Sequence, residues 1–371
     1  MDKTRAHNLI SQAGFGLTAA GAIGAYCICL CAVFNQGVIV ALTCAVLFTL
    51  ASVKRGAVYT PSPLLAVSFF LLLQLNSLPL AIISLAIGCV LCLILSKRLK
   101  GAMPPDFVMG GIFIGLALCA TILFTNTYFG IGAYGATTLD MLKSYRSLGF
   151  HPDFRGLLYG TITLFTMITY PFKFRRLKNI IPAEFITILI PFILNLILNP
   201  NAAYTTTNEY FAAEISFSMP DADYATISRG VLSAAAVTGF VLYLLSDKTD
   251  SPRPCSVFSA HPAIPCKGTG FTVVSVATAI VTIAGVVLLA PSLVYRLPLP
   301  CVGAMLIVSA WQHTSFKPLT STIKEKSVLK LLLLISCGVA FVIFTPDYAI
   351  SYCLMLWVIT KLIHRRREAN K

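Results

Sequence analysis

Charged residues are scarce in this chain of 371 residues. Asp, Glu, Lys and Arg make up 11% of it and hydrophobic residues 57%, whereas soluble domains contain roughly 25% charged and about 45–50% apolar residues. So few charges cannot cover the surface of a soluble globular protein of this size. No polar connection is long enough for a soluble domain either. We therefore expect a single transmembrane domain over residues 1–371, with no soluble domain.

The sequence also lacks the common catalytic motifs. It contains no Walker A loop, no G-x-S-x-G elbow and no H-E-x-x-H helix, so nothing supports an ATP-driven or hydrolytic reaction. The five histidines show no metal-ligand spacing, and no further ligand completes a site around Cys27, Cys29 and Cys31. We predict no enzyme activity, no metal and no cofactor. A membrane enzyme acting on lipids is a weaker alternative, because paired acids are missing.

Long apolar runs are what the sequence does contain. Each of twelve runs is separated from the next by a short polar segment, as expected for a polytopic membrane protein whose helices need about 20 apolar residues each. The runs lie near residues 10–32, 37–52, 60–75, 78–96, 107–126, 156–172, 181–198, 228–245, 271–293, 299–312, 328–345 and 347–362. The pattern predicts an all-α protein embedded in a lipid bilayer.

The chain has a net charge of +14, and its basic residues are distributed unevenly among the connections between these runs. Counting alternate connections from the N-terminus, 23 of the 28 Lys and Arg residues fall on one side of the membrane. This asymmetry is the positive-inside rule, and it places both termini in the cytoplasm. We therefore predict a multi-pass protein of the inner or plasma membrane, and no nucleic-acid partner. The five exceptions are Lys143, Arg146, Arg155, Arg229 and Arg296.

The third apolar run is interrupted at its start. It opens with Tyr59-Thr60-Pro61-Ser62-Pro63, and two prolines this close cannot lie inside a regular helix. The segment predicts extended backbone followed by a half-helix from about Pro63. Irregular backbone at membrane depth is tolerated where it is buried in protein or lines a cavity. A span that simply begins late in the interface is the alternative.

A second irregular segment covers residues 246–270. It contains four prolines and ends in Lys267-Gly268-Thr269-Gly270, directly before a long apolar run. Glycines at a helix start let backbone amides approach a ligand, and the helix dipole there attracts anions. The alternative is a cytoplasmic loop leading into an ordinary helix start.

Glu184 is the one carboxylate well inside an apolar run. It follows Pro182 at the start of the seventh run, where an acid complements the positive end of the helix dipole. An ionisable residue within the membrane is also a functional candidate. Helix capping and a role in transport both remain open from the sequence.

Four stretches resemble the sulfate permease (SulP) family of anion transporters. Residues 51–68 contain the Tyr59 to Pro63 bend and resemble the family's third segment, and residues 103–115, with Met-Pro-Pro-Asp-Phe, resemble the start of its fifth. Residues 175–186 are similar to the start of its seventh segment. Residues 288–311, with several prolines and a closing Trp311, are similar to its eleventh and twelfth.

This resemblance implies a membrane domain of two inverted repeats of seven segments. It implies a core-like part, residues 10–97 and 228–293, that moves against a gate-like part, residues 105–198 and 299–362. It also implies a small anion as substrate, such as sulfate, bicarbonate or a related oxyanion, and a tendency to form homodimers. A proton or sodium ion is a possible coupling ion.

The chain departs from the family pattern in three ways. We expect this chain to lack the cytosolic STAS domain that usually follows in the family. Only about 25 residues separate the run ending at Leu245 from the run at 271, where two spans would need roughly 40. The second repeat therefore looks shortened: either residues 260–270 form a shortened re-entrant piece, or half of the anion site is lost. The acid of the family's eighth segment has no counterpart beyond Tyr243 and Ser246.

We hypothesise a secondary transporter or permease for a small anion, bound between two facing half-helix N-termini. A membrane scaffold or partner subunit that kept a degenerate transporter fold is the alternative. Hydroxyl and aromatic groups would complete the site, with Gln12 also available on the first span. The predicted substrate-binding residues are Ser62, Pro63, Leu64, Ser68, Gly268, Thr269, Gly270, Tyr243 and Tyr26.

Overall fold

The computed structural model describes most of the chain. The described residues are 3–33, 38–53, 58–69, 72, 77–99, 104–133, 135, 137–149, 154–174, 181–198, 220–246, 258–260, 272–286, 296–314 and 316–369.

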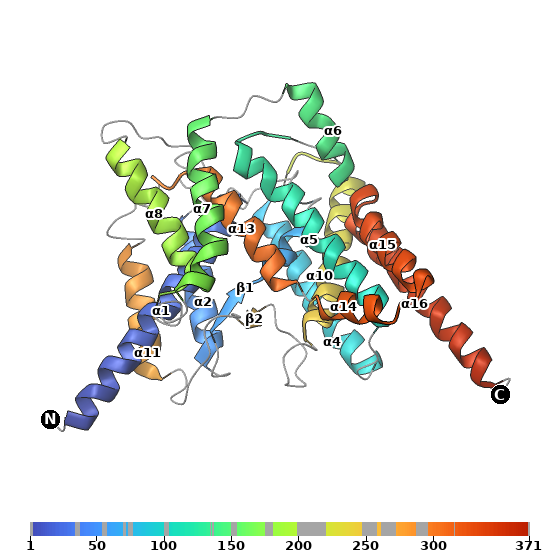
Figure 1. Ribbon diagram of the computed structural model, residues 1–371, viewed down its shortest axis with the longest axis horizontal. Helices are drawn as coiled ribbons and strands as arrows, with labels where there is room; N and C mark the ends of the chain where they lie inside the picture. Colours follow the sequence, from blue (N-terminus) through green and yellow to red (C-terminus); the bar gives the residue numbers. More distant parts are fainter. Residues whose placement is uncertain are drawn as a thin grey trace.

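These residues form fourteen helices and two strands of three residues each (Figure 1). The elements in chain order are α1 (Lys3–Val33), α2 (Val38–Val53), β1 (Tyr59–Pro61), the 3₁₀ helix η1 (Pro63–Phe69), α4 (Leu78–Leu99), α5 (Asp106–Phe129), α6 (Thr138–Leu148), α7 (Phe154–Lys173), α8 (Ala183–Leu198), α10 (Tyr224–Ser246), β2 (Phe258–Ala260), α11 (Val273–Ala284), α13 (Leu299–His313), α14 (Lys317–Lys324), α15 (Val328–Ile343) and α16 (Pro346–Ala369).

Every apolar run predicted from the sequence contains one of these helices, so the all-helical, multi-pass class is confirmed. Four helices are long and apolar enough to cross a bilayer, and several shorter apolar helices accompany them. The start of α1 and the end of α16 both lie on the lower side of the molecule in Figure 1, at opposite ends of its longest axis. Two helices were not predicted. They are α6 and α14, which lie in the polar connections 127–155 and 313–327.

Two pairs of helices pack closely against each other along their lengths. Helix α1 packs along α11, and helix α10 packs along α4. The α4–α10 contact needs a glycine, because a Cβ at Gly88 would lie 2.8 Å from the Cβ of Thr238. In the α1–α11 contact, the hydroxyl of Thr272 donates to Oε1 of Gln12 at 3.1 Å, and the hydroxyl of Ser275 donates to the Gln12 carbonyl at 2.9 Å. Gln12 therefore joins two helices.

A second group of helices is built around α5 and α13. Helix α5 packs on α13 and α15, while α13 also packs on α7. The indole Nε1 of Trp311 on α13 donates to the hydroxyl of Thr121 on α5 at 3.0 Å. Helix α13 also contacts α1, α8 and η1. It therefore lies at the meeting point of the two groups.

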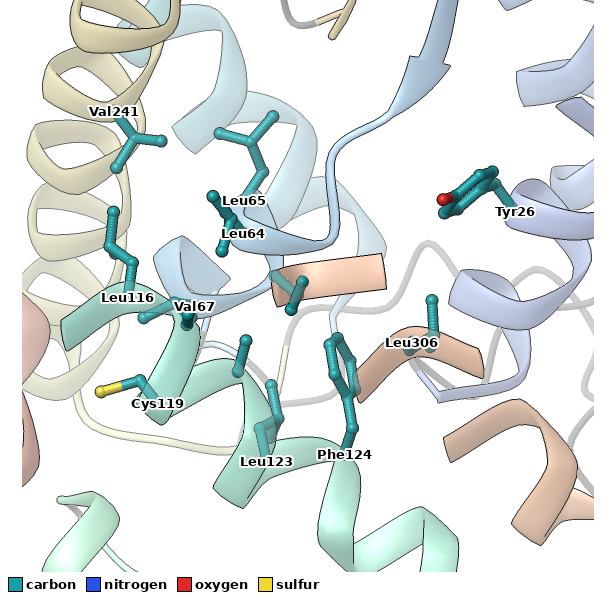
Figure 2. Close-up of a cluster of buried hydrophobic side chains, with 14 of the residues drawn as sticks. Tyr26, Leu64, Leu65, Val67, Leu116, Cys119, Leu123, Phe124, Val241 and Leu306 are labelled. Atoms are coloured by element: carbon teal, nitrogen blue, oxygen red, sulfur yellow. The ribbon is translucent and has the colours of Figure 1, made fainter. Parts of the chain in front are cut away.

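The interior is apolar and the helices at the rim expose apolar side chains. Figure 2 shows buried side chains gathering from η1, α5 and α10, among them Val67, Leu116 and Val241. On α4, by contrast, Ile82 and Val90 are exposed by 53% and 54%. An exposed apolar helix face of this kind is stable in contact with lipid. The surface therefore agrees with a protein embedded in a bilayer.

Candidate functional site

The two irregular segments singled out in the sequence meet in the structure. Strand β1 pairs with β2 in antiparallel register, with Thr60 opposite Ser259 and Pro61 opposite Phe258. The pair lies in the middle of the molecule in Figure 1. Because no water satisfies backbone groups in the membrane interior, strand pairing is a way for extended backbone to exist there. The proline-rich segment thus contributes its extended part directly beside the bend at Tyr59.

The bend leads into a short buried helix, as predicted. Pro63 and Leu64 are buried at the start of η1, and the N–H of Leu65 donates to the carbonyl of Ser62 at 3.0 Å, which closes the first turn. Pro63 has no N–H to leave unsatisfied, and its fixed φ suits a helix start. The observed helix is a 3₁₀ helix. This tighter form is typical of short helical pieces.

Two hydroxyls of this segment are buried and have no hydrogen-bond partner among the described residues. They belong to Ser62 and Ser68, whose side chains are exposed by only 2% and 3%. A buried polar group without a partner costs about 1–3 kcal/mol. These hydroxyls are therefore available as donors to a bound polar ligand.

The hydroxyls of Ser62 and Ser68 lie too far apart to bind the same small ligand. A 3₁₀ helix rises about 2.0 Å per residue, so the six steps from Ser62 to Ser68 span about 12 Å. One small anion cannot contact both hydroxyls. They can serve two successive positions along the helix.

Tyr26 on α1 is the predicted site residue whose surroundings are best defined. Its side chain is fully buried, and its hydroxyl lies 3.0 Å from Oγ of Ser309 and 3.5 Å from Oε1 of Glu184. Figure 2 shows its ring pointing from α1 toward the side on which β1 leads into η1. Gln12 lies fourteen residues earlier on α1, or about 21 Å along the helix. Gln12 and Tyr26 therefore do not border one pocket.

Of the other predicted site residues, the structure describes Tyr243 but not the three residues 268–270. Tyr243 is buried near the end of α10, a helix that packs on η1. Gly268, Thr269 and Gly270 lie outside the described residues, between β2 and α11.

Residues that sequence reasoning missed surround Tyr26. Ser309 and His313 lie one turn apart on α13, and both are buried. The rings of Tyr26 and His313 meet edge to face, with centroids 5.8 Å apart. Their four-residue spacing on an apolar helix was the available signal, because it places both side chains on one face.

Other candidate sites are few within the described part of the chain. No group of three or more His, Cys, Asp or Glu residues there could hold a metal ion. A cavity of about 270 Å³ is lined by Arg155, Leu158, Tyr159 and Leu198, on α7 and α8. None of these residues belongs to the predicted anion site.

Comparison with solved structures identifies the fold. The transmembrane domain of a cyanobacterium bicarbonate transporter, BicA, matches with a TM-score of 0.65 at 14% identity, over 92% of this chain and 97% of that one. The overall structure of SLC26A9 matches with a TM-score of 0.67 at 11% identity, over 96% of this chain and 65% of that one. Murine Solute Carrier 26 family member A9 (Slc26a9), an anion transporter in the inward-facing state, matches with a TM-score of 0.67 at 13% identity, over 96% of this chain and 68% of that one.

No protein-family model and no curated protein sequence matches the chain. The likeness therefore rests on the fold. Over most of its length, this chain has the fold of the transmembrane domain of the SLC26 and SulP transporters. The resemblance seen in the sequence is confirmed at this level, and the chain is a multi-pass membrane protein.

Proposed function

We propose that this protein is a secondary transporter or permease for a small anion of the oxyanion class, such as sulfate or bicarbonate. The observation that carries the proposal is the pairing of β1 with β2 beside the buried hydroxyl of Ser62, which has no hydrogen-bond partner in the described part of the chain. A site of this kind holds negative charge with hydroxyls and helix amides and needs no buried Arg. The transport function of the similar structures agrees with it.

In the proposed site the anion lies between η1 and the segment that follows β2. Ser62, Pro63 and Leu64 form one wall. Gly268, Thr269 and Gly270 form the other, where the lack of a side chain on the two glycines lets backbone amides approach the ligand. Ser68, Tyr243 and Tyr26 border the path.

Transport would proceed by movement of a core against a gate. The core comprises residues 10–97 and 228–293, and the gate comprises residues 105–198 and 299–362. The packing of α1 on α11 and of α10 on α4 supports a core built from two related halves, and α5, α7, α13 and α15 pack together as the gate would. Such a division agrees with an inverted repeat of transporter type.

The proposed membrane is the inner or plasma membrane, with both termini in the cytoplasm. Support comes from the 23 of 28 basic residues that share one side in the alternating count. A homodimer is a reasonable assembly for this fold. The proposal assigns the protein transport and no enzymatic reaction.

Uptake into liposomes tests the proposal. Purified protein reconstituted in liposomes should take up labelled sulfate or bicarbonate above the level of empty liposomes. Pro63→Ala, which frees the fixed start of η1, and Gly270→Leu, which blocks the approach of amides, should abolish this uptake. Folded wild-type protein without uptake of either anion would instead support a non-transporting scaffold.

A further inference from the structure

A polar cluster lies where α1, α8 and α13 meet. It consists of Tyr26, Glu184, Ser309 and His313, and each side chain is exposed by 8% or less. The proposed anion site uses Tyr26 alone among them. In the proposed division α1 belongs to the core, whereas α8 and α13 belong to the gate. The cluster therefore joins the two parts that must move against each other.

Hydrogen bonds connect the side chains of Glu184, Tyr26 and Ser309, and His313 is joined to them through the backbone carbonyl of Ser309. Tyr26 has one hydroxyl proton, and its oxygen lies 3.5 Å from Oε1 of Glu184 and 3.0 Å from Oγ of Ser309. The Nδ1 atom of His313 lies 2.8 Å from the carbonyl oxygen of Ser309. A carbonyl oxygen only accepts, so Nδ1 donates, and Nε2 is the nitrogen that takes up a further proton.

The state of Glu184 determines the direction of these hydrogen bonds. When the carboxylate is ionised, it can only accept, and the Tyr26 hydroxyl can donate to it. When the carboxyl group holds a proton, it can donate to the oxygen of Tyr26, which then donates to Ser309. Adding one proton therefore reverses the hydrogen bonds that join α8, α1 and α13.

Both states of Glu184 have a stabilising feature in the structure. Glu184 lies in the first turn of α8, where helix amides stabilise a negative charge. Its side chain is also 3% exposed, and burial favours the neutral acid. The geometry gives this carboxyl group more than a capping role, because its oxygen contacts a residue of another helix.

Within the described ranges, few other titratable groups face the cluster from the helices around it. On α1, Cys29 lies three residues after Tyr26 and contacts Met305 of α13. On α7, the hydroxyl of Tyr170 donates to the carbonyl of Ile181 just before α8, and Lys173 is exposed at the end of that helix. On α13, Cys301 is buried three turns before His313.

We propose that Tyr26, Glu184, Ser309 and His313 form a proton-binding site, and that the proton on Glu184 controls the affinity of the transporter for its anion. This inference rests on the proposed anion transport. Protonation removes a negative charge from the contact between core and gate and reverses its hydrogen bonds. A neutral cluster favours a nearby anion, so proton and anion bind together. By linkage, each then strengthens the binding of the other.

Infrared difference spectroscopy tests proton binding without transport. Purified wild-type protein moved from mildly alkaline to mildly acidic buffer should gain the C=O band of a protonated carboxyl group. Glu184→Gln should remove this band. Glu325→Gln, which alters an exposed carboxylate paired with Lys330, should leave it unchanged. A wild-type protein without the band, or a band that persists in Glu184→Gln, would overturn the proposal.

Uptake in liposomes tests the coupling. Wild-type affinity for labelled sulfate should rise on acidification by up to about tenfold per pH unit, the limit for one linked proton. Glu184→Gln should keep a high affinity that no longer depends on pH, and Glu184→Asp should restore the dependence. Tyr26→Phe should shift the pH at which the change in sulfate affinity is half complete. A Glu184→Gln profile that follows wild type would refute the coupling, whereas absence of all wild-type uptake would refute the proposed function and leave the infrared result standing.

Discussion

Tyr59 and Ala260 are partners across the antiparallel pair of β1 and β2, although they come from opposite halves of the chain. The pairing joins the two segments in which prolines exclude a regular spanning helix. Neither strand could exist alone at this depth, because unsatisfied backbone groups are costly there. Each irregular segment therefore makes the other possible.

A cross-link should detect this pairing directly. Cα atoms of residues paired in an antiparallel ladder lie about 4.5–5.5 Å apart, within the range that a disulfide spans. Mild oxidation of the double variant Thr60→Cys/Ser259→Cys should therefore produce a disulfide, identified by peptide mass spectrometry. The single variants are the controls. A double variant that stays reduced under oxidation that is sufficient for surface cysteines would contradict the pairing.

The glycines at close helix contacts should be intolerant of larger residues. A Cβ at Gly88 would lie 2.8 Å from the side chain of Thr238, so Gly88→Val overpacks the α4–α10 contact. We expect a loss of about 1–3 kcal/mol in the free energy of unfolding, measured as a lower midpoint of thermal unfolding in detergent. Gly14→Ala is the matched control, because nothing lies within 4 Å of a Cβ there.

Much of the fold could be predicted from the sequence. The apolar runs gave the helices, because only continuous apolar segments are stable across a bilayer. The prolines at 61 and 63 gave the break before η1, because proline excludes a regular helix interior. Helices α6 and α14 were missed, since short polar helices carry no signal of this kind. In α6, capping by Thr137, whose hydroxyl accepts from the N–H of Asp140, marks the start.

The site could be predicted only in part. Local sequence indicated that residues near Pro63 are special, but pairing with β2 depends on a contact between distant segments. Ser309 and His313 were missed for the same reason, since a few polar residues in an apolar helix are ordinary. Their role becomes visible only through Tyr26, which α1 brings into contact with both of them, and through Glu184, which α8 brings to the Tyr26 hydroxyl.

Labelling should establish the orientation in the membrane. The basic residues predict that the connection between α14 and α15 faces the cytoplasm. In intact cells, an impermeant thiol reagent should label Asp221→Cys, which lies just before α10, and should not reach Lys326→Cys. After permeabilisation both should react. The reverse pattern in intact cells would show that the termini lie outside.

Ser62→Ala should separate function from stability. Its hydroxyl is buried, and no hydrogen-bond partner is found for it among the described residues, so its removal takes away a cost of about 1–3 kcal/mol. The variant should unfold at the same or a higher temperature than wild type in anion-free detergent, yet take up labelled sulfate more slowly. Ser84→Ala is the control. That buried hydroxyl donates to the carbonyl of Leu80 at 2.7 Å, so its loss should cost stability and leave uptake unchanged. If Ser62→Ala lost stability while keeping wild-type uptake, the hydroxyl would serve the fold, and Ser62 would have to be removed from the proposed anion site.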